Sequence, residues 1–366
     1  MTYSLTPTHQ IPAVQYGLSP AEAVLSKANA ALGGAVLLSA LIAPPPVWAF
    51  GAVGAAAAAL NLAPGPRSVA RWTAIGYRRL RERTAPDSMT DRPGAMATWA
   101  LYADHGTMQD PRRRAEFHAA LARSLDFAGS QARTAGIQVH VTHHAAVGDY
   151  AAHSQTISVY VPRGLVGQPE RLLATLEGEL AQLGALSEVE PDPVPEVTER
   201  GPGWVALGAG HYASTARITG WPAEADGDLM SRLLLGDRTD QSAHYATDRS
   251  FAVLYRPLTP AQSRRSARWR DALAGAWTTD KVKAEARELV GGTTHAALVQ
   301  GATLVDLDAY MTVWGDSPEA VTDARWQAGL VADRYRVRLD WLTGQQHRAH
   351  VMTTPHGAST AKGALL

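Results

Sequence analysis

Residues 28–66 read ANAALGGAVLLSALIAPPPVWAFGAVGAAAAALNLAPGP, and these 39 consecutive positions carry no charged side chain. Three prolines, at positions 44–46, divide the run near its middle. A stretch this long without a charge is typical of two short membrane-spanning helices joined by a tight proline turn. The sequence therefore predicts a transmembrane hairpin over residues 24–66, preceded by a cytoplasmic tail of residues 1–23.

The basic flank of this run sets the expected orientation. Residues 67–83 contain six arginines and a single glutamate, and such clusters stay on the cytoplasmic side of a membrane. We therefore expect a two-pass inner-membrane protein with both termini in the cytoplasm, and a basic juxtamembrane helix and linker over residues 67–95. The residues expected at the interface with the lipid bilayer are Lys27, Arg67, Arg71, Trp72, Arg78, Arg79, Arg81 and Arg83.

A helical hairpin rich in alanine and buried within a soluble protein is the alternative interpretation of the same run. Gly51, Gly54 and the alanines at 55–59 would allow two helices to approach closely in either setting. A cleaved signal peptide is disfavoured, because the apolar run begins late and no basic region precedes it.

Composition excludes some functions for the rest of the chain. Lysine and arginine number 34, as do aspartate and glutamate, so the formal net charge is zero. A general polyanion-binding protein would need a basic excess to contact phosphates. The chain has no cysteine, which excludes disulfides and thiolate chemistry. The roughly 280 residues after position 88 are enough for two domains of modest size.

Four residue–proline pairs predict the starts of helices, because proline is well tolerated in the first helical turn. The residues that follow show apolar side chains at helical spacing, as in Leu172, Leu176 and Leu180 after the second pair. The four pairs are Asp110-Pro111, Gln168-Pro169, Thr259-Pro260 and Ser317-Pro318.

Alternating apolar residues around these helices predict strands. From residue 96 to 197 the order is strand, helix, strand, strand, helix and a further strand, which is the split βαβ order of a ferredoxin-like sandwich. A proline-rich acidic stretch at 188–196 follows, and a similar order resumes beyond it. We expect an α+β fold with two ferredoxin-like cytoplasmic domains, at residues 96–197 and 198–366.

No sequence motif points to catalysis. A nucleotide-hydrolysing protein of the Walker type needs G-x-x-x-x-G-K-[ST], and a serine hydrolase of the α/β type needs G-x-S-x-G; neither occurs in the chain. We therefore expect no catalytic residue and no cofactor, and an ATPase activity would have to come from a partner.

Histidines cluster at His140, His143, His144 and His153. On one strand His140 and His144 would share a face about 13 Å apart at roughly 3.3 Å per residue, too far for a common zinc ion. No metal site is expected. Asp306 and Asp308 alternate with apolar residues, so both are expected to face solvent, with a catalytic carboxylate pair as the alternative.

A basic helical patch is the candidate docking site for a partner. It consists of Arg264, Arg265 and Arg268 around Trp269. A solvated helix face and contact with nucleic acid are the alternatives.

Several stretches, together with the two apolar segments before them, form a pattern in a fixed order: Arg71-Trp72, Tyr77–Arg79, Tyr212–Pro222, Phe251–Pro257, Tyr310–Val313 and Leu342–Gln346. Together they resemble actinobacterial conjugation proteins that join a PrgI-like two-helix anchor to a domain similar to the N-terminal domain of VirB-type secretion ATPases. The anchor layout of EccE, a subunit of type VII secretion, is similar too and is the competing resemblance.

The resemblance implies a non-catalytic inner-membrane component of a conjugative or type IV-like secretion machine, which docks a partner ATPase through its α+β domains within an oligomeric complex that includes other membrane subunits. An EccE-like subunit of a type VII complex and a membrane-tethered enzyme with an unrecognised site are the alternatives.

Overall fold

The computed structural model describes residues 3–4, 29–31, 33–36, 47–61, 69, 72–73, 75–76, 94–104, 107, 110–131, 136–146, 152–163, 168–222, 224–225, 229–236, 247–267, 298–299, 302–360 and 365. The chain divides into two compact units. The larger comprises residues 1–9 and 88–365, and the smaller comprises residues 10–87 with residue 366.

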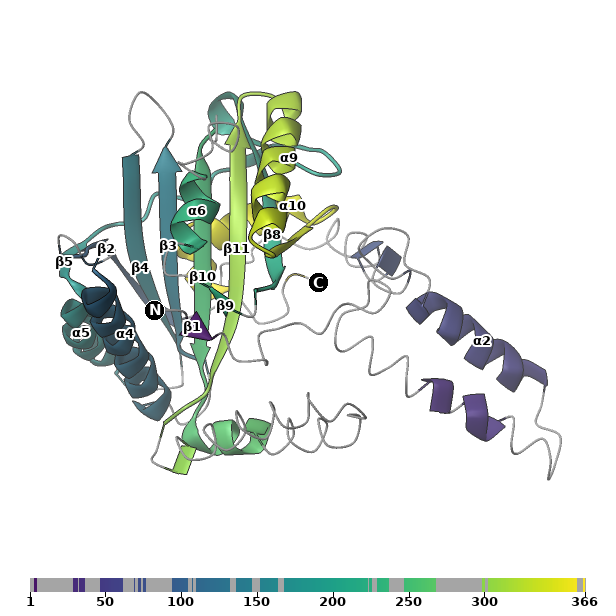
Figure 1. The fold of residues 1–366 in the computed structure, drawn as a ribbon, viewed down its shortest axis with the longest axis horizontal. Helices are drawn as coiled ribbons and strands as arrows, with labels where there is room; N and C mark the ends of the chain where they lie inside the picture. The colour runs from purple at the N-terminus through teal and green to yellow at the C-terminus, as the bar shows by residue number, and fades with distance from the viewer. Residues whose placement is uncertain are drawn as a thin grey trace. The chain divides into compact units, whose positions relative to one another are not determined.

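A 10-stranded antiparallel sheet forms the centre of the larger unit (Figure 1). Its strand order is β5-β2-β4-β3-β10-β11-β8-β7-β6, and β12 pairs with β8 as well. The strands are β2 (Gly94–Tyr102), β3 (Gln138–Ala146), β4 (Ala152–Pro162), β5 (Ala185–Glu188), β6 (Val197–Arg200), β7 (Val205–Leu207), β8 (His211–Gly220), β10 (Arg249–Pro257), β11 (Val305–Gly315) and β12 (Arg338–Trp341). A separate two-stranded sheet pairs β1 (Tyr3–Ser4) with β9 (Glu224–Ala225).

Five described α-helices of the larger unit contact this sheet (Figure 1), and a further helical stretch, residues 260–267, follows β10. The α-helices are α4 (Pro111–Gln131), α5 (Pro169–Leu180), α6 (Leu229–Leu235), α9 (Pro318–Arg334) and α10 (Gln346–Ala349). The short 3₁₀ helices are η2 (Ala181–Leu183), η3 (Gly208–Gly210), η5 (His350–Thr353) and η6 (Pro355–Ser359).

Each half of the sheet has the same internal order. In the first half, β2-α4-β3-β4-α5-β5 along the chain gives the spatial order β5-β2-β4-β3. In the second, β8-α6-β10-β11-α9-β12 gives β12-β8-β11-β10. Both are the fourth-first-third-second arrangement of a split βαβ unit. The halves join through β3 and β10, paired antiparallel from Ala145↔Arg249 to Val139↔Tyr255.

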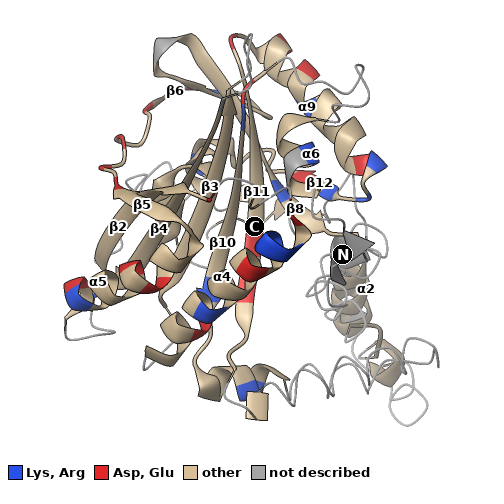
Figure 2. Ribbon diagram, turned by 60° about the vertical axis from the view of Figure 1, so that its left-hand side comes forward, with Lys and Arg blue, Asp and Glu red and all other residues tan. Residues whose placement is uncertain are grey.

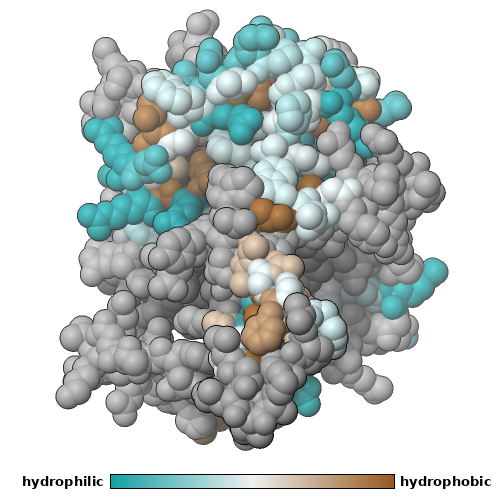
Figure 3. Space-filling model, turned by 90° about the vertical axis from the view of Figure 1, so that its right-hand side faces the viewer, coloured by the Kyte–Doolittle hydropathy of each residue, from teal (hydrophilic) through white to brown (hydrophobic). Residues whose placement is uncertain are grey.

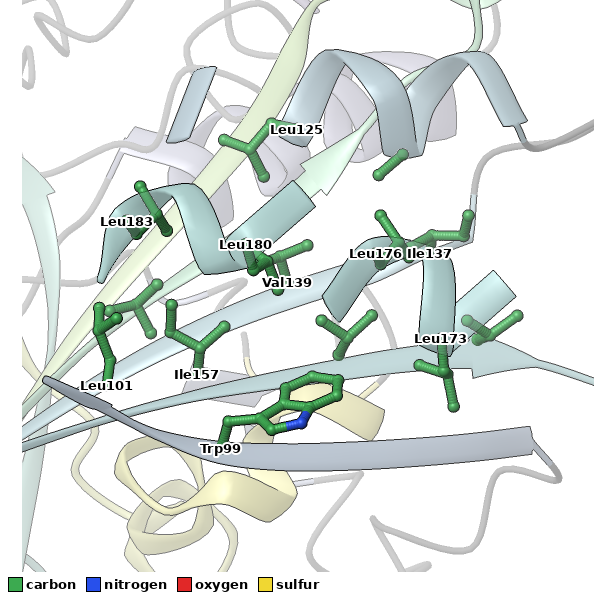
Figure 4. Close-up of a cluster of buried hydrophobic side chains, with 14 of the residues drawn as sticks. Trp99, Leu101, Leu125, Ile137, Val139, Ile157, Leu173, Leu176, Leu180 and Leu183 are labelled. Atoms are coloured by element: carbon green, nitrogen blue, oxygen red, sulfur yellow. The ribbon is translucent and has the colours of Figure 1, made fainter. Parts of the chain in front are cut away.

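The first half buries its core between α4, α5 and the strands (Figure 4). Pro169 begins α5, and the leucines that follow at intervals of three and four residues face the strands, among them Leu176, which is 1% exposed. Trp99 of β2 and Ile157 of β4 meet them from the sheet. Burying a leucine of this kind stabilises the fold by roughly 1.5–3 kcal/mol.

In the second half, α9 packs against β8, β11 and β12. The Ser317 side chain accepts a hydrogen bond from the Ala320 backbone N–H at 3.1 Å, which caps the helix, and Pro318 follows in the first turn. The buried face of α9 includes Val321 and Ala328. Small residues on this face let the helix lie close to β11, where Met311 is fully buried.

The C-terminal segment, α10 with η5 and η6, contacts β3, β4, β8, β10 and β11. Leu254 and Tyr310, which point to this side of the sheet, form a small core with Leu342 and Met352. The Gln346 side chain joins the strands directly: its Oε1 accepts from the Thr215 backbone N–H at 2.7 Å and its Nε2 donates to the Thr215 carbonyl at 2.9 Å.

The predicted transmembrane hairpin over residues 24–66 is wrong: searched over the described residues, the structure has no helix that is both long and apolar enough to cross a membrane. Helix α2 (Val47–Asn61) has 15 residues and is therefore about 22 Å long, short of the roughly 30 Å hydrocarbon core. The prediction of a two-pass inner-membrane protein with both termini in the cytoplasm is corrected with it.

The smaller unit contains α2 and helical residues at 29–31 and 33–36. The Asn29 side-chain amide donates to the Val53 carbonyl at 3.3 Å. A Cβ atom on Gly33 would lie 3.1 Å from a methyl carbon of Val53, so the small residues of the uncharged run allow two helical stretches to pack closely.

The predicted fold, a transmembrane hairpin followed by two ferredoxin-like sandwiches, is therefore corrected to a mixed helix and sheet structure. Its sheet runs without interruption through both halves. The expected domain boundary at 197/198 falls at the start of β6, which belongs to that sheet. The domain limits given above stay predictions.

We predict that Gln346→Leu lowers the free energy of unfolding by about 1–3 kcal/mol, because the buried Thr215 N–H would lose its acceptor. The Thr215 carbonyl would still accept from the Leu342 N–H at 3.0 Å. Urea unfolding followed by circular dichroism measures the change. The exposed Gln182→Leu serves as the control, and an equal loss in both variants would contradict the assignment.

Candidate functional site

The structure describes two of the four residues of the predicted basic docking patch, Arg264 and Arg265. Helical residues 260–267 begin with a reciprocal capping box: the Gln262 N–H donates to Thr259 Oγ1 at 3.2 Å, and the Thr259 N–H donates to Gln262 Oε1 at 3.3 Å. Arg264 and Arg265 are exposed, so a partner could reach them. Arg268 and Trp269 lie outside the described residues.

Of the residues expected at a membrane interface, the structure describes Trp72, which is helical and half-buried. The others lie outside the described residues: Lys27, Arg67, Arg71, Arg78, Arg79, Arg81 and Arg83.

The histidine cluster divides between the two faces of the sheet. His143 and His153 stack with ring centroids 5.3 Å apart, and Nδ1 of the first lies 3.1 Å from Nε2 of the second. His144 points to the other face, where its Nδ1 lies 3.0 Å from Ser250 Oγ. Within the described part of the chain, no group of three or more histidine, aspartate or glutamate side chains could hold a metal ion.

His140 is buried and fastens the C-terminal segment to the sheet. Its Nε2 lies 3.0 Å from the Met352 carbonyl, and since that oxygen can only accept, Nε2 must carry the proton and donate. A Cβ atom on Gly357 would lie 2.7 Å from His140 Cε1, so glycine is needed where η6 crosses the ring. Burial lowers the pKa of His140 to about 4, although the bond to Met352 acts in the opposite direction.

Asp308 lies between two arginines from neighbouring strands. Its carboxylate accepts from Arg217 of β8 and from Arg256 of β10, and Arg256 Nε also donates to Gln138 Oε1 at 3.1 Å. Burial would raise the pKa of Asp308, but the charges of Arg217 and then Arg256 hold that pKa below its usual value. The expectation that Asp306 and Asp308 both face solvent is wrong for Asp308, whose side chain is 12% exposed.

The outer face of α9 carries the most exposed tryptophan described in the larger unit. Trp326 is 67% exposed and Leu330, one turn later, is 50% exposed. Glu319, Asp323 and Asp333 are exposed on the same helix. Figure 3 views the molecule from the right-hand side of Figure 1, and the described surface in its upper part is mainly hydrophilic or neutral with scattered hydrophobic residues.

The side chain of Arg325, the residue before Trp326, points away from the exposed face of α9 and toward Trp341 and Gly203. Its guanidinium lies 4.8 Å from the centroid of the Trp341 ring and its NH1 donates to the Gly203 carbonyl at 3.4 Å. The helical period places Asp323 one turn before Trp326, and Asp333 and Arg334 one turn after Leu330, so charges of both signs border the exposed pair. Sequence reasoning missed it, although the helical period from Pro318 places residues 326 and 330 opposite the buried alanines.

We predict that His140 makes the fold sensitive to acid. The reference pKa of histidine is 6.5 and the folded value is about 4, so between these pH values the unfolded chain binds more protons. His140 should therefore contribute a fall of about 3 kcal/mol in the free energy of unfolding as the pH drops from 6.5 to 4, in addition to the contribution of His143, whose pKa burial lowers to about 3.

The measurement is urea unfolding at several pH values. His140→Gln should lose this part of the pH dependence, whereas the exposed His211→Gln should keep it. Parallel pH profiles for wild type and His140→Gln would refute the prediction.

No protein-family model matches the chain, and no curated protein sequence matches it. The assignment of function therefore rests on the residues and geometry described above.

Proposed function

We propose that this protein is a non-catalytic docking subunit that holds a partner ATPase of the kind used by conjugative or secretion machines. The observation that carries the proposal is the exposed Trp326–Leu330 pair on α9. The membrane anchor implied by the resemblance has no part in it.

The pair has the properties of a binding hot spot. Tryptophan is enriched at the centres of protein interfaces, where it supplies a large contact area with few rotatable bonds. Covering the exposed parts of Trp326 and Leu330 would remove apolar area from water, which favours association. Their positions are well defined, because the opposite face of α9 is packed on the sheet and Ser317 caps the helix.

Charged and titratable side chains of the sheet bind other parts of the same fold, which supports a structural role for these side chains. Asp308 is engaged by Arg217 and Arg256, and His140 by the Met352 carbonyl. Each is a charged or titratable group bound by other parts of the same fold. The sequence lacks a Walker phosphate loop, which is the reason to assign ATP hydrolysis to the partner.

A direct binding measurement tests the proposal. The probe is a purified ATPase with a G-x-x-x-x-G-K-[ST] loop whose gene neighbours that of this protein, and the lack of any such neighbouring gene would itself count against the proposal. We predict that Trp326→Ala weakens binding at least 30-fold, as expected for a hot spot worth about 2 kcal/mol. Leu330→Ala should weaken it by a smaller factor.

Thr322→Ala is the matched control, since Thr322 is exposed on the same helix and should leave the affinity within twofold. Circular dichroism checks that each variant is folded. Failure of the wild-type protein to bind that ATPase, or ATP hydrolysis by the isolated chain, would refute the proposed function.

A further inference from the structure

The two halves of the sheet differ in how the outer side of their first strand is covered. In the second half, the first strand of the split βαβ unit, β8, is covered on its outer side along its whole length. β7 pairs with residues 211–213, and β12 pairs with residues 216–220. Between them Thr215 is bonded by the Gln346 side chain and by the Leu342 N–H. No stretch of this edge is left open.

The equivalent strand of the first half, β2, is covered over half of its length. β5 pairs with Trp99–Tyr102, and the Val189 N–H donates to the Thr98 carbonyl at 2.9 Å. On this side no described strand pairs with Gly94–Ala97. Gly94 is exposed and Met96 is half-buried.

Strand alternation identifies the open backbone groups. In an antiparallel pair, every second residue directs both its N–H and its C=O to the same neighbour. Thr98 directs its carbonyl to the β5 side, so Met96 and Gly94 direct theirs to that side as well. These four backbone groups point away from β4 and form a short row that can accept a further strand.

Two prolines explain why β5 does not continue along this row. The β2–β5 register pairs Trp99 with Glu188, and continuing it would place Pro191 opposite Met96 and Pro193 opposite Gly94. These are the two positions whose N–H groups would have to donate to the open carbonyls. Proline has no N–H, so this chain cannot close the edge by lengthening β5.

From this geometry we infer that the open edge at Gly94–Ala97 binds an extended, basic-flanked segment of the partner protein as an added strand. This inference rests on the proposed docking function and places a second contact of the same partner on β2. Adding a strand to a free sheet edge is a common mode of peptide recognition, in which main-chain hydrogen bonds supply much of the affinity.

The chemistry of the segment follows from two features. The equivalent edge in the second half holds β7, whose Val205, Ala206 and Leu207 are all buried, so the centre of the segment is apolar. Glu188 at the end of β5, and Glu190 and Asp192 in the chain that leaves it, are all exposed, and Figure 2 shows acidic residues along the segment that joins β5 to β6. Lysine or arginine on either side of the apolar centre would complement them.

The first experiment needs no natural partner. The probe is the synthetic peptide Lys-Lys-Val-Ala-Leu-Lys-Lys, and the control peptide has proline in place of the central alanine. Hydrogen exchange of the Met96 amide, followed by NMR, reports the added strand. We expect the probe to slow this exchange at least tenfold at saturation and the proline peptide to leave it within twofold.

Variants of the chain provide the second arm. Pro191→Val combined with Pro193→Val should let β5 extend over the edge and weaken probe binding at least tenfold. Met96→Pro removes an outward N–H and should weaken it similarly. Pro195→Ala is the matched control, because position 195 lies beyond the reach of β2 in this register, and it should bind as the wild type does.

The outcomes separate the two proposals. If the probe protects Met96 but the ATPase does not bind, the open edge stands and the proposed function fails. If the probe leaves Met96 exchange unchanged, or both edge variants bind it as tightly as the wild type, the inference is overturned. A dimer in light scattering that is lost in the Pro191→Val, Pro193→Val variant would also overturn it, because a second copy would then be the occupant.

Discussion

The antiparallel pairing of β3 with β10 is the constraint on which the larger unit depends. Each half alone would end at one of these strands with an open edge, and long open edges invite aggregation. Joining them closes both edges and produces the 10-stranded sheet. The strand that each half contributes is the second of its split βαβ unit, so the halves meet as like parts. Their first strands, β2 and β8, are consequently placed toward the two outer sides, where one is fully covered and the other is not.

On the face of the sheet that carries the C-terminal segment, polar side chains link the strands to one another and to that segment. The hydroxyl groups of Thr215, Thr312 and Thr353 lie in sequence at 2.7 Å spacing, which links β8, β11 and η5. His140 adds the contact from β3 to η5. A buried hydrogen-bonded network of this kind stabilises one arrangement and is costly to disrupt. His140, which the sequence offers as a candidate metal ligand, therefore stabilises the fold through this contact.

Local features could be predicted from the sequence, and long-range ones could not. Proline pairs place the starts of α4, α5 and α9 at Pro111, Pro169 and Pro318, as the structure has them, because proline acts on its own turn. The ion pairs of Asp308 involve residues 52 and 91 positions away, which no local pattern encodes. The uncharged run was misinterpreted since a short packed helix and a membrane span share the same composition, and helix length decides between them. The open edge of β2 depends on the β2–β5 register, so Pro191 and Pro193 gained meaning only from the structure.

Cysteine cross-linking across β3 and β10 tests the central claim most directly, and the absence of native cysteine makes the result easy to read. Val141 and Val253 are paired across the two strands, within the range of Cα separations that disulfides bridge. The double variant Val141→Cys, Val253→Cys should therefore oxidise to an intramolecular disulfide in nearly all molecules. The control pair Val141→Cys, Ala252→Cys places the two thiols on opposite faces and should not. Equal cross-linking of the two pairs, or none in either, would contradict the joined sheet.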